Sequence, residues 1–347
     1  MSNDMPVFVG LDYHQHSVQV SVVDGAGKMI LNRGCANEWE KIVGLAQGLG
    51  RVQRVAIEAC CGAADLASEL RREAGWTVDL AHPQYVSRMK RSPDKSDFSD
   101  GRMLADLTRV GYLPTVWLPG EFERDLRQQV NYRQKLVDQR RAVKLRVCAI
   151  LRERRVKAPP DYARWTVKWM RWIRQAPGLR ETGCWLVGEL LDELDHLNKK
   201  VQKADEQLER FVGEDALTKR LLEEPGIGPV TAWVLRGLVG RFDRFGSGKQ
   251  LSRYCGLSPC NASSGARVAD AGLISGCNRL LRATMIQAAH RLMRCQRRWI
   301  DLRLCMESRG KPACVIAAAV ANRWVRGLWH RLATSKAAEP AEALKSL

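Results

Sequence analysis

Eight apolar residues near the middle of the chain are spaced alternately three and four residues apart. They are Val187, Leu190, Leu194, Leu197, Val201, Ala204, Leu208 and Phe211. This spacing is the a/d seam of a long helix, because the side chains of a strand alternate with a period of two. An antiparallel helix of the same chain can cover such a seam, but a bare seam of this length more often pairs two chains. We therefore predict a coiled coil over residues 185–212 and a homo-oligomer, either a dimer or a tetramer.

A strongly basic segment precedes the seam. Residues 124–157 contain twelve Arg or Lys and three acids, and their apolar residues recur at helical spacing. A charge run is usually the solvated face of a packing helix, whereas a fourfold excess of one sign indicates a surface that follows phosphates. We favour the second interpretation for residues 121–184. The candidate nucleic-acid contacts are Arg124, Arg127, Arg133, Lys135, Arg140, Arg141, Lys144 and Arg146.

The charge of the whole chain agrees with a polyanionic partner. Its 347 residues include 56 Lys or Arg against 38 Asp or Glu, which gives a formal charge of +18. Cationic side chains release counterions when they bind nucleic acid, so DNA and RNA are the first candidates. No apolar run in the sequence reaches the length of a membrane span, and the N-terminal residues do not follow the pattern of a signal peptide. The sequence therefore predicts a cytoplasmic protein without a membrane partner.

The first 120 residues alternate strands and helices in the manner of an α/β domain. Residues 7–31 contain three short strands, and Asp24-Gly25 is the hairpin turn between the second and the third. After a helix, residues 51–60 read as a buried strand of the parallel kind, followed by a helix and by the strand 76–81. The order strand, strand, strand, helix, strand, helix, strand, helix predicts a mixed sheet over residues 1–120.

The last part of the chain, residues 213–334, reads as a mainly helical and basic domain, followed by a loose tail at 335–347. It opens with PGIGP, in which Gly226 and Gly228 lie between two helical segments. This layout resembles a helix-hairpin-helix element, whose glycines let backbone amides approach a phosphate. Turns of Gly and Pro between helices are also common, which is the purely structural alternative.

Four carboxylates form the candidate metal site. Asp12 directly follows the first strand, and Glu58 lies near the end of the fourth. An unpaired acid is costly at a buried strand, so one acid at each of two apolar strands indicates a shared cation. If those strands are neighbours, a helix over their edge can add Asp97 and Asp100, whose spacing of three places both on one helical face. Four carboxylates suit Mg²⁺, with Mn²⁺ as the alternative ion, and a pair of such ions supports phosphoryl transfer.

A local interpretation of Asp97 and Asp100 competes with the metal site. The stretch KSDFSDGRMLADL begins a helical pattern, and an acid at the N-cap followed by another acid three residues later is a capping-box arrangement. Taken alone, the stretch favours the cap. Asp12 and Glu58 favour the metal site, since a cap needs no acids at two remote strands. Both interpretations hold if Asp97 starts the helix and turns its carboxylate to the ion.

The ordered set of motifs resembles a known family. The hairpin-first strand order, with its four acids, resembles the RNase H-like fold in its RuvC version. The basic helix that follows the RuvC-like domain in Piv-type DNA invertases and in the "one-ten" family of insertion-sequence transposases has a counterpart in DLRQQVNYRQKLVDQRRAVKLRVCAILRE. The family's second conserved domain has counterparts, in the same order, in PGIGPVTA, FGSGKQLSRYCGLSP and GLISGCNRLLRATMIQAA. The resemblance covers roughly residues 5–330.

The resemblance implies a fold and a mechanism. The implied fold is α/β plus α, with an RNase H-like (RuvC-like) N-terminal domain, a coiled coil and a mainly helical C-terminal recombinase domain. The implied activity is site-specific recombination by a metal site together with a serine nucleophile. In several members a structured non-coding RNA, the bridge RNA, pairs with donor and target DNA.

The family serine aligns with Ser275 in ISGCNRLLR. This stretch lacks the Lys that follows the serine in the family motif and is one residue shorter before the Asn, so Ser263 and Ser264 are the alternatives. Without the family, Ser275 reads as a helix N-cap. Arg279 and Arg282, one turn further on, either hold phosphate or are solvated.

Three functions are compatible with these motifs. The leading hypothesis is a transposase or site-specific DNA recombinase, guided by a bridge RNA, that cuts and rejoins DNA through a phosphoserine with the assistance of Mg²⁺. The first alternative is a metal-only RuvC-like nuclease or Holliday-junction resolvase, in which water attacks. The second is a nucleic-acid-binding protein without catalysis. His14 and His16 are candidates for proton transfer, although exposed histidines in a strand turn are more often idle.

Overall fold

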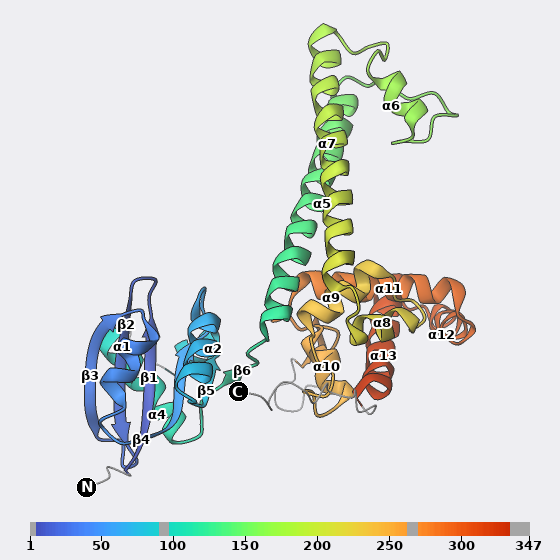
Figure 1. The fold of residues 1–347 in the computed structure, drawn as a ribbon. Coiled ribbons are helices and arrows are strands. Elements are labelled where there is room, and N and C mark those ends of the chain that lie inside the picture. The colour runs from blue at the N-terminus through green and yellow to red at the C-terminus, as the bar shows by residue number, and fades with distance from the viewer. Residues whose placement is uncertain (1–4, 90–96, 262–269, 334–347) are drawn as a thin grey trace. The chain divides into compact units, whose positions relative to one another are not determined.

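The computed structural model describes residues 5–89, 97–261 and 270–333, and the chain divides into two units, residues 1–120 and 121–347. The first unit contains one six-stranded sheet with the order β3-β2-β1-β4-β5-β6 (Figure 1). Its strands are β1 Pro6–Tyr13, β2 Ser17–Asp24, β3 Met29–Ala36, β4 Arg51–Glu58, β5 Val78–Ala81 and β6 Thr115–Val116. Its helices are α1 Trp39–Ala46, α2 Ala63–Glu73, α3 Pro83–Ser87 and α4 Asp97–Arg109.

The sheet is mixed, as the strand order predicts. Strands β1, β2 and β3 form an antiparallel meander, β4 runs parallel to β1, and β5 runs parallel to β4. Asp24 closes the second hairpin, because its Oδ1 accepts hydrogen bonds from the amides of Ala26 and Lys28, both at 2.9 Å. The structure adds two short elements to the prediction, α3 and the edge strand β6, which is antiparallel to β5.

Two glycines let helix α4 lie directly on the sheet. A Cβ atom at Gly10, in β1, would be 2.0 Å from the carbonyl oxygen of Gly101. A Cβ atom at Gly101, in α4, would be 2.7 Å from the Oγ of Ser21 in β2. Any larger residue at these positions would hold the two backbones apart. The close approach therefore sets the depth at which the first turn of α4 meets the sheet.

The second unit combines a long helical hairpin with a helical domain. The hairpin consists of α5 Glu121–Glu153 and α7 Glu181–Val212, and the segment that connects them contains the short α6 Val167–Ile173 (Figure 1). The remaining helices are α8 Ala216–Glu223, α9 Pro229–Leu238, α10 Gly248–Tyr254, α11 Arg279–Cys295, α12 Arg297–Glu307 and α13 Ala313–Ala333. A two-stranded sheet of β7 Pro259–Asn261 and β8 Asp270–Leu273 precedes α11. The predicted tail at 335–347 lies outside the described residues.

The heptad seam is covered within the chain. Helices α5 and α7 lie side by side, and the order of their contacts is antiparallel, because Arg133 pairs with Asp205 while Arg140 reaches Asn198 (Figure 1). From Val187 to Ala204, the seam packs into one core with apolar residues of α5, among them Leu136, Val143, Val147 and Leu151. Leu208 and Phe211 pack in the core of the helical domain. The intramolecular hairpin thus replaces the predicted pairing of two chains. The reason is that α5 has its own apolar row and is as long as α7, so the seam gives no argument for an oligomer.

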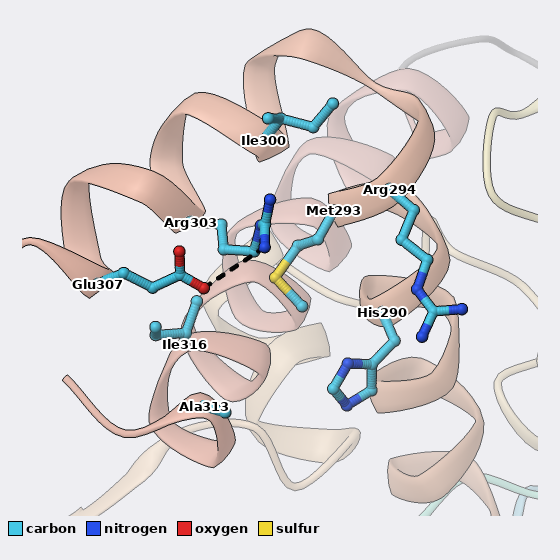
Figure 2. Close-up of a pocket in the computed structure, with 8 residues that line it drawn as sticks. All are labelled: His290, Met293, Arg294, Ile300, Arg303, Glu307, Ala313 and Ile316. Atoms are coloured by element: carbon cyan, nitrogen blue, oxygen red, sulfur yellow. Dashed lines mark hydrogen bonds and ion pairs between the residues drawn. The ribbon is translucent and has the colours of Figure 1, made fainter.

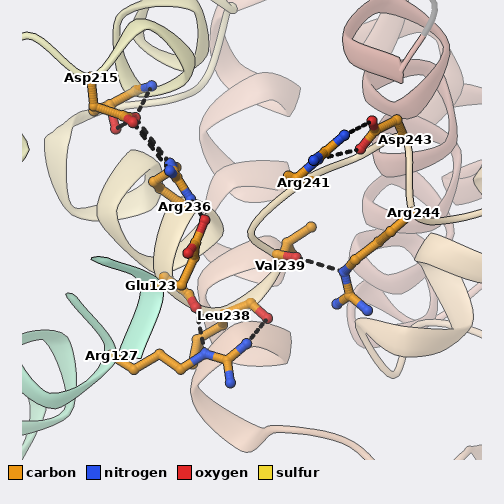
Figure 3. A network of polar contacts seen from close by, with 11 residues as sticks. Glu123, Arg127, Asp215, Arg236, Leu238, Val239, Arg241, Asp243 and Arg244 are labelled. Carbon is orange, nitrogen blue, oxygen red and sulfur yellow. Dashed lines mark hydrogen bonds and ion pairs between the residues drawn. The ribbon is translucent and has the colours of Figure 1, made fainter. Parts of the chain in front are cut away.

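A buried ion-pair network ties the base of α5 to the helical domain. Arg236, in α9, donates to Glu123 of α5 at 2.5 Å and to both carboxylate oxygens of Asp215, the N-cap of α8, at 3.0 and 3.1 Å (Figure 3). The three side chains are 11 to 16% exposed. Since α5, α8 and α9 share this network, it fixes where the hairpin leaves the domain.

Within the described ranges, no helix is both long enough and apolar enough to cross a bilayer.

Candidate active site

Asp12 and Glu58 lie at the ends of neighbouring parallel strands. The ladder between β1 and β4 ends with the pair of Leu11 and Ile57, and each acid is the next residue on its strand. Parallel strands carry their carboxyl ends to the same edge of a sheet, so the two acids reach one edge. The apolar residues before them form the buried core of the first unit, which anchors the acids from below.

Helix α4 brings a third acid to the same edge, and the turn after β1 brings a histidine. Asp97 is the first residue of α4, and its Oδ2 lies 3.2 Å from the Nε2 of His14. The same Nε2 lies 3.6 Å from the Oδ2 of Asp12. Each of the three side chains has a ligand atom within 4.8 Å of the others. His14 was expected to be idle; the structure instead puts its imidazole between two carboxylates.

Electrostatic effects on Asp12 link Asp100 and Glu58 to this cluster. Burial raises the pKa of Asp12, His14 opposes that rise, and the charges of Asp97, Asp100 and Glu58 raise the pKa further. All three acids therefore act on Asp12 through space. Asp100 is 7% exposed and lies three residues after Asp97 on the sheet-facing side of α4. A carboxylate whose pKa is raised by burial and by neighbouring negative charges suits a divalent cation, which relieves both costs.

The chemistry of the donors fits Mg²⁺ or Mn²⁺. Carboxylate oxygens are hard ligands, which both ions prefer, and an imidazole is compatible with Mn²⁺. Asp97 is about half exposed, with 55% of its side chain accessible, whereas Asp12 is 16% exposed. The cluster is thus anchored on the buried side and open on the other, where a phosphate can reach it.

Ser275 lies on an exposed loop between β8 and α11. The amide of Ile274 donates to the carbonyl of Ser258, and Arg282 donates to the carbonyl of Ile274. The N-cap of α11 is Asn278, whose side chain accepts from the amide of Leu281 at 3.1 Å. The cap interpretation of Ser275 is therefore wrong, because another residue caps the helix. The alternatives, Ser263 and Ser264, lie outside the described residues.

Arg282 supports the serine loop and is partly buried. Besides its bond to Ile274, its guanidinium packs on Gly256, where a Cβ atom would be 2.7 Å from the Nε of Arg282. Gly256 has a φ of +72°, a conformation that glycine adopts without strain. Arg279, by contrast, is exposed in the first turn of α11. Of these two arginines, Arg279 is the one that is open to a phosphate.

Several of the basic residues of α5 have partners inside the chain. Arg127 donates to the carbonyls of Gly237 and Leu238 at the end of α9 (Figure 3), and burial lowers its pKa. Lys144 lies 4.9 Å above the ring of Trp165. Arg133 and Arg140 bridge to α7, as described above. Arg127 therefore ties α5 to α9, and the other three side chains hold the hairpin and its connection together. Periodicity and charge counts could not reveal these internal partners.

The other basic residues of α5 remain at the surface. Lys135, Arg141 and Arg146 are exposed, and Arg124 is partly buried. The phosphate-following surface of this helix is therefore smaller than its composition indicates.

The glycines of PGIGP join α8 to α9 in a tight turn. Gly226 has a φ of +88°, and a Cβ atom there would be 2.7 Å from the Cδ2 of Leu292 in α11. Gly228 is the N-cap of α9, and a Cβ atom there would meet nothing closer than the guanidinium of Arg291, at 3.8 Å. Gly226 is thus required by the fold, whereas Gly228 leaves the amides at the start of α9 accessible from one side.

Two parts of the chain match families of known proteins. Residues 9–155 match a DEDD transposase family model, and residues 218–303 match the model of the transposase IS116/IS110/IS902 family. The chain is 29% identical to a probable family 20 transposase of Pseudomonas aeruginosa, over 82% of this chain and 86% of the relative. It is 24% identical to the transposase for insertion sequence element IS1328 of Yersinia enterocolitica, over 92% and 95%. It is 25% identical to the transposase for insertion sequence element IS1111A of Coxiella burnetii, over 93% and 89%.

Proposed function

The chain belongs to the IS116/IS110/IS902 family of insertion-sequence transposases, enzymes of DNA cleavage and strand transfer, and from this premise we propose which residues do the chemistry. The first unit is an RNase H-like domain of the RuvC kind, and its four catalytic acids are Asp12, Glu58, Asp97 and Asp100. The observation that carries this proposal is the gathering of Asp12, Asp97 and His14 within 4.8 Å at one sheet edge.

The four acids would hold Mg²⁺, or Mn²⁺ as the alternative, with His14 beside them. When bound, such an ion neutralises the charge that develops on the phosphoryl oxygens. The residues of the chain keep the site in shape: the core under β1 and β4 fixes Asp12 and Glu58, and α4 delivers Asp97 and Asp100 through its glycine contact. The Nε2 of His14 contacts Asp12 and Asp97, so its ring orients the two carboxylates.

A cleavage assay with matched variants tests the metal site. A plasmid that carries the element and its flanking DNA is incubated with the protein and with RNA transcribed from the element, with and without Mg²⁺. We expect strand cleavage only with Mg²⁺, and a loss of at least a hundredfold in Asp12→Asn and in Asp97→Asn, because each removes a charged ligand without changing the side-chain shape. Asp106→Asn, on the same helix but paired with Arg109 at 3.2 Å, is the control and should cut normally. Intact cleavage by Asp97→Asn would remove Asp97 from the site.

We infer that Ser275 is the nucleophile. Its hydroxyl oxygen bonds to the phosphorus of the scissile phosphodiester as the bond from phosphorus to one deoxyribose oxygen breaks. The serine proton passes to a base, and the released deoxyribose oxygen takes up a proton; the reverse attack by a hydroxyl of another strand rejoins the DNA and frees the serine. This assignment is supported by the exposure of Ser275 and by the cap at Asn278, which leaves the serine hydroxyl without a capping role.

The partners that we propose are donor DNA, target DNA and a structured guide RNA of the bridge type, in a homo-oligomer acting in the cytoplasm. The +18 charge and the exposed Lys135, Arg141, Arg146 and Arg279 support nucleic-acid partners. The protein purified from cells that carry the whole element should retain a specific transcript from the flanking non-coding DNA. Retention of bulk cellular RNA without enrichment of that transcript would contradict a guided mechanism.

A further inference from the structure

A cavity of about 460 Å³ lies between α11, α12 and α13 (Figure 2). Apolar side chains of Met293, Ile300 and Ile316 line it, and Met293 and Ile316 are buried. Its volume falls in the range of small-ligand sites, roughly 300 to 1,000 Å³. None of the four acids or the serine loop contributes to it. The cavity, called the α12 pocket below, is therefore separate from the groups assigned to catalysis.

The polar rim of the α12 pocket is mainly cationic. His290 and Arg294 come from α11, and Arg303 and Glu307 come from α12 (Figure 2). Glu307 is paired with Arg303 at 3.5 Å, so the acid does not cancel the charge of Arg294. The Nε of Arg303 is buried and meets no hydrogen-bond acceptor within the described residues. The Arg303 side chain as a whole is 39% exposed, so a ligand can still reach the rest of its guanidinium.

The surroundings of the α12 pocket point to a nucleic-acid strand. Arg291 and Arg298 are exposed near the turn between α11 and α12. Arg298 also lies over the ring of Trp299, with its guanidinium carbon 4.9 Å from the ring centroid. Exposed arginines near the pocket can bind the phosphates of a nucleic-acid backbone. An apolar cavity with hydrogen-bond donors and acceptors suits an unstacked base.

We propose that the α12 pocket holds one unstacked nucleotide of single-stranded DNA. The base lies on Met293, Ile300 and Ile316, and its phosphate is bound by Arg294 and His290. Arg303 donates to a base acceptor, and Glu307 accepts from an exocyclic amine, the pairing that acidic side chains make with bases. This inference rests on the proposed function, since cleavage and exchange of strands is what exposes single-stranded DNA to the protein.

Fluorescence of a 2-aminopurine oligonucleotide tests the proposal. This base is quenched when stacked and emits when it is taken out of the stack. We expect emission to rise when wild-type protein binds a short single strand that carries the probe. Ala313→Trp fills the pocket from the exposed start of α13, and Arg294→Gln removes the phosphate ligand. Each should lose the emission and weaken single-strand affinity by about fivefold, the size expected when one buried apolar contact or one phosphate contact is lost.

Arg297→Gln is the matched control. It removes an arginine of α12 whose side chain is 89% exposed and paired with Asp301, and which does not line the pocket. It should keep the emission, with at most a small general loss of affinity. Affinity for duplex DNA should be the same in Ala313→Trp as in the wild type, because a stacked base cannot enter the pocket.

Three results would overturn the proposal. The first is unchanged emission and affinity in both pocket variants. The second is an effect with RNA strands alone, which would assign the pocket to an RNA. The third is a change in oligomeric mass on Ala313→Trp without any change in oligonucleotide binding, which would assign the pocket to a second copy of the chain. Asp12→Asn should keep the emission signal, so a failure of the proposed metal chemistry is distinguishable from a failure of this pocket.

Discussion

At Asp12, the arrangement that suits a bound cation opposes the stability of the metal-free fold. Burial raises its pKa, His14 opposes the rise, and three neighbouring acids add to it. An acid whose pKa is higher in the folded state than in the unfolded state binds protons more tightly when folded, so the free energy of unfolding falls as pH rises between the two pKa values. Above its folded-state pKa, the ionised Asp12 therefore destabilises the metal-free protein. Such a cost is expected of a metal ligand, because binding of a cation would offset it.

Thermal unfolding of Asp12→Asn tests this account. In EDTA at neutral pH, the variant should melt a few degrees higher than the wild type, because it removes the buried charge and the repulsion. Addition of Mg²⁺ should raise the melting temperature of the wild type but not that of the variant, since only the wild type binds the ion tightly. An equal rise in both proteins would show that the ion binds elsewhere.

His14 gives a second prediction at the residue scale. Its Nε2 contacts Asp12 and Asp97, so His14→Ala removes both a candidate ligand and the group that orients the carboxylates. We expect the affinity for Mn²⁺, measured by electron paramagnetic resonance, to fall by about tenfold, the usual cost of losing a group that orients ligands. His16→Ala, two residues further along the same turn, should bind Mn²⁺ like the wild type. Equal losses in the two variants would contradict a specific role for His14.

The acids of the candidate site could be predicted, but their neighbours could not. Asp12 and Glu58 stand out because each interrupts an apolar strand, a pattern that can be read directly from the sequence. The role of His14 depends on the direction in which a turn points its side chain, and no spacing rule encodes that. The cap at Asn278 was missed for a similar reason, because Ser and Asn are equally good caps and only the start of α11 decides between them.

At the scale of elements, the contact between α4 and β1 decides whether the acids meet. Gly10→Ala would put a methyl group 2.0 Å from the backbone oxygen of Gly101, so the helix must move away. We expect a loss of stability of roughly 2 to 4 kcal/mol, as for an overpacked core, together with a loss of Mg²⁺ binding. Gly44→Ala, in α1, where a Cβ atom would meet nothing within 4 Å, should be neutral or slightly stabilising. Urea unfolding measures both, and a Gly10→Ala protein as stable as the wild type would refute the tight contact.

The Arg236 network makes a prediction about pH. Burial alone would raise the pKa of Asp215, but hydrogen bonds from Arg236 and Thr218 lower it overall. A lowered pKa means that stability is present above the unfolded-state pKa and is lost as pH falls through the folded-state pKa. Asp215→Asn keeps the N-cap of α8, since Asn caps equally well, but removes the charge. Its melting temperature should be lower than that of the wild type at neutral pH, and the difference should shrink in acid.

Asp243→Asn is the control for the network (Figure 3). Asp243 pairs with Arg241 at 2.7 Å, but both side chains are about half exposed, and exposed pairs contribute at most about 1 kcal/mol. Breaking a buried pair costs about 3 to 5 kcal/mol. If Asp243→Asn destabilised the protein as much as Asp215→Asn, the buried network would not be what anchors α5.

The helical elements show where periodicity stops being informative. The seam correctly predicts a long helix over residues 187–211, because a heptad pattern is incompatible with strands. It does not identify the partner, since the apolar face of α5 and the face of a second chain offer the same kind of surface. The basic residues of α5 were likewise assigned to phosphate, although Arg127 and Arg133 are held by a helix end and by Asp205. Charge counts cannot separate internal partners from external ones.

At the scale of the whole molecule, the chain combines an acidic site in a small unit with a basic helical unit. The excess of cations attracts DNA without regard to sequence, so affinity should fall steeply as salt increases. The acids and the serine lie in different units, and the proposed reaction needs both. A metal-only nuclease needs the acids alone, and this difference is the basis of the decisive test.

Trapping of DNA strands on the protein is that test. Wild-type protein, Asp97→Asn and Ser275→Ala are each incubated with Mg²⁺, RNA transcribed from the element and labelled DNA of the element, then denatured and separated by electrophoresis. We predict a covalent protein–DNA adduct with the wild type, and neither an adduct nor free cut strands with either variant. Free cut strands produced by Ser275→Ala, or an adduct formed as readily by Asp97→Asn as by the wild type, would contradict a recombinase that needs both its acids and its serine.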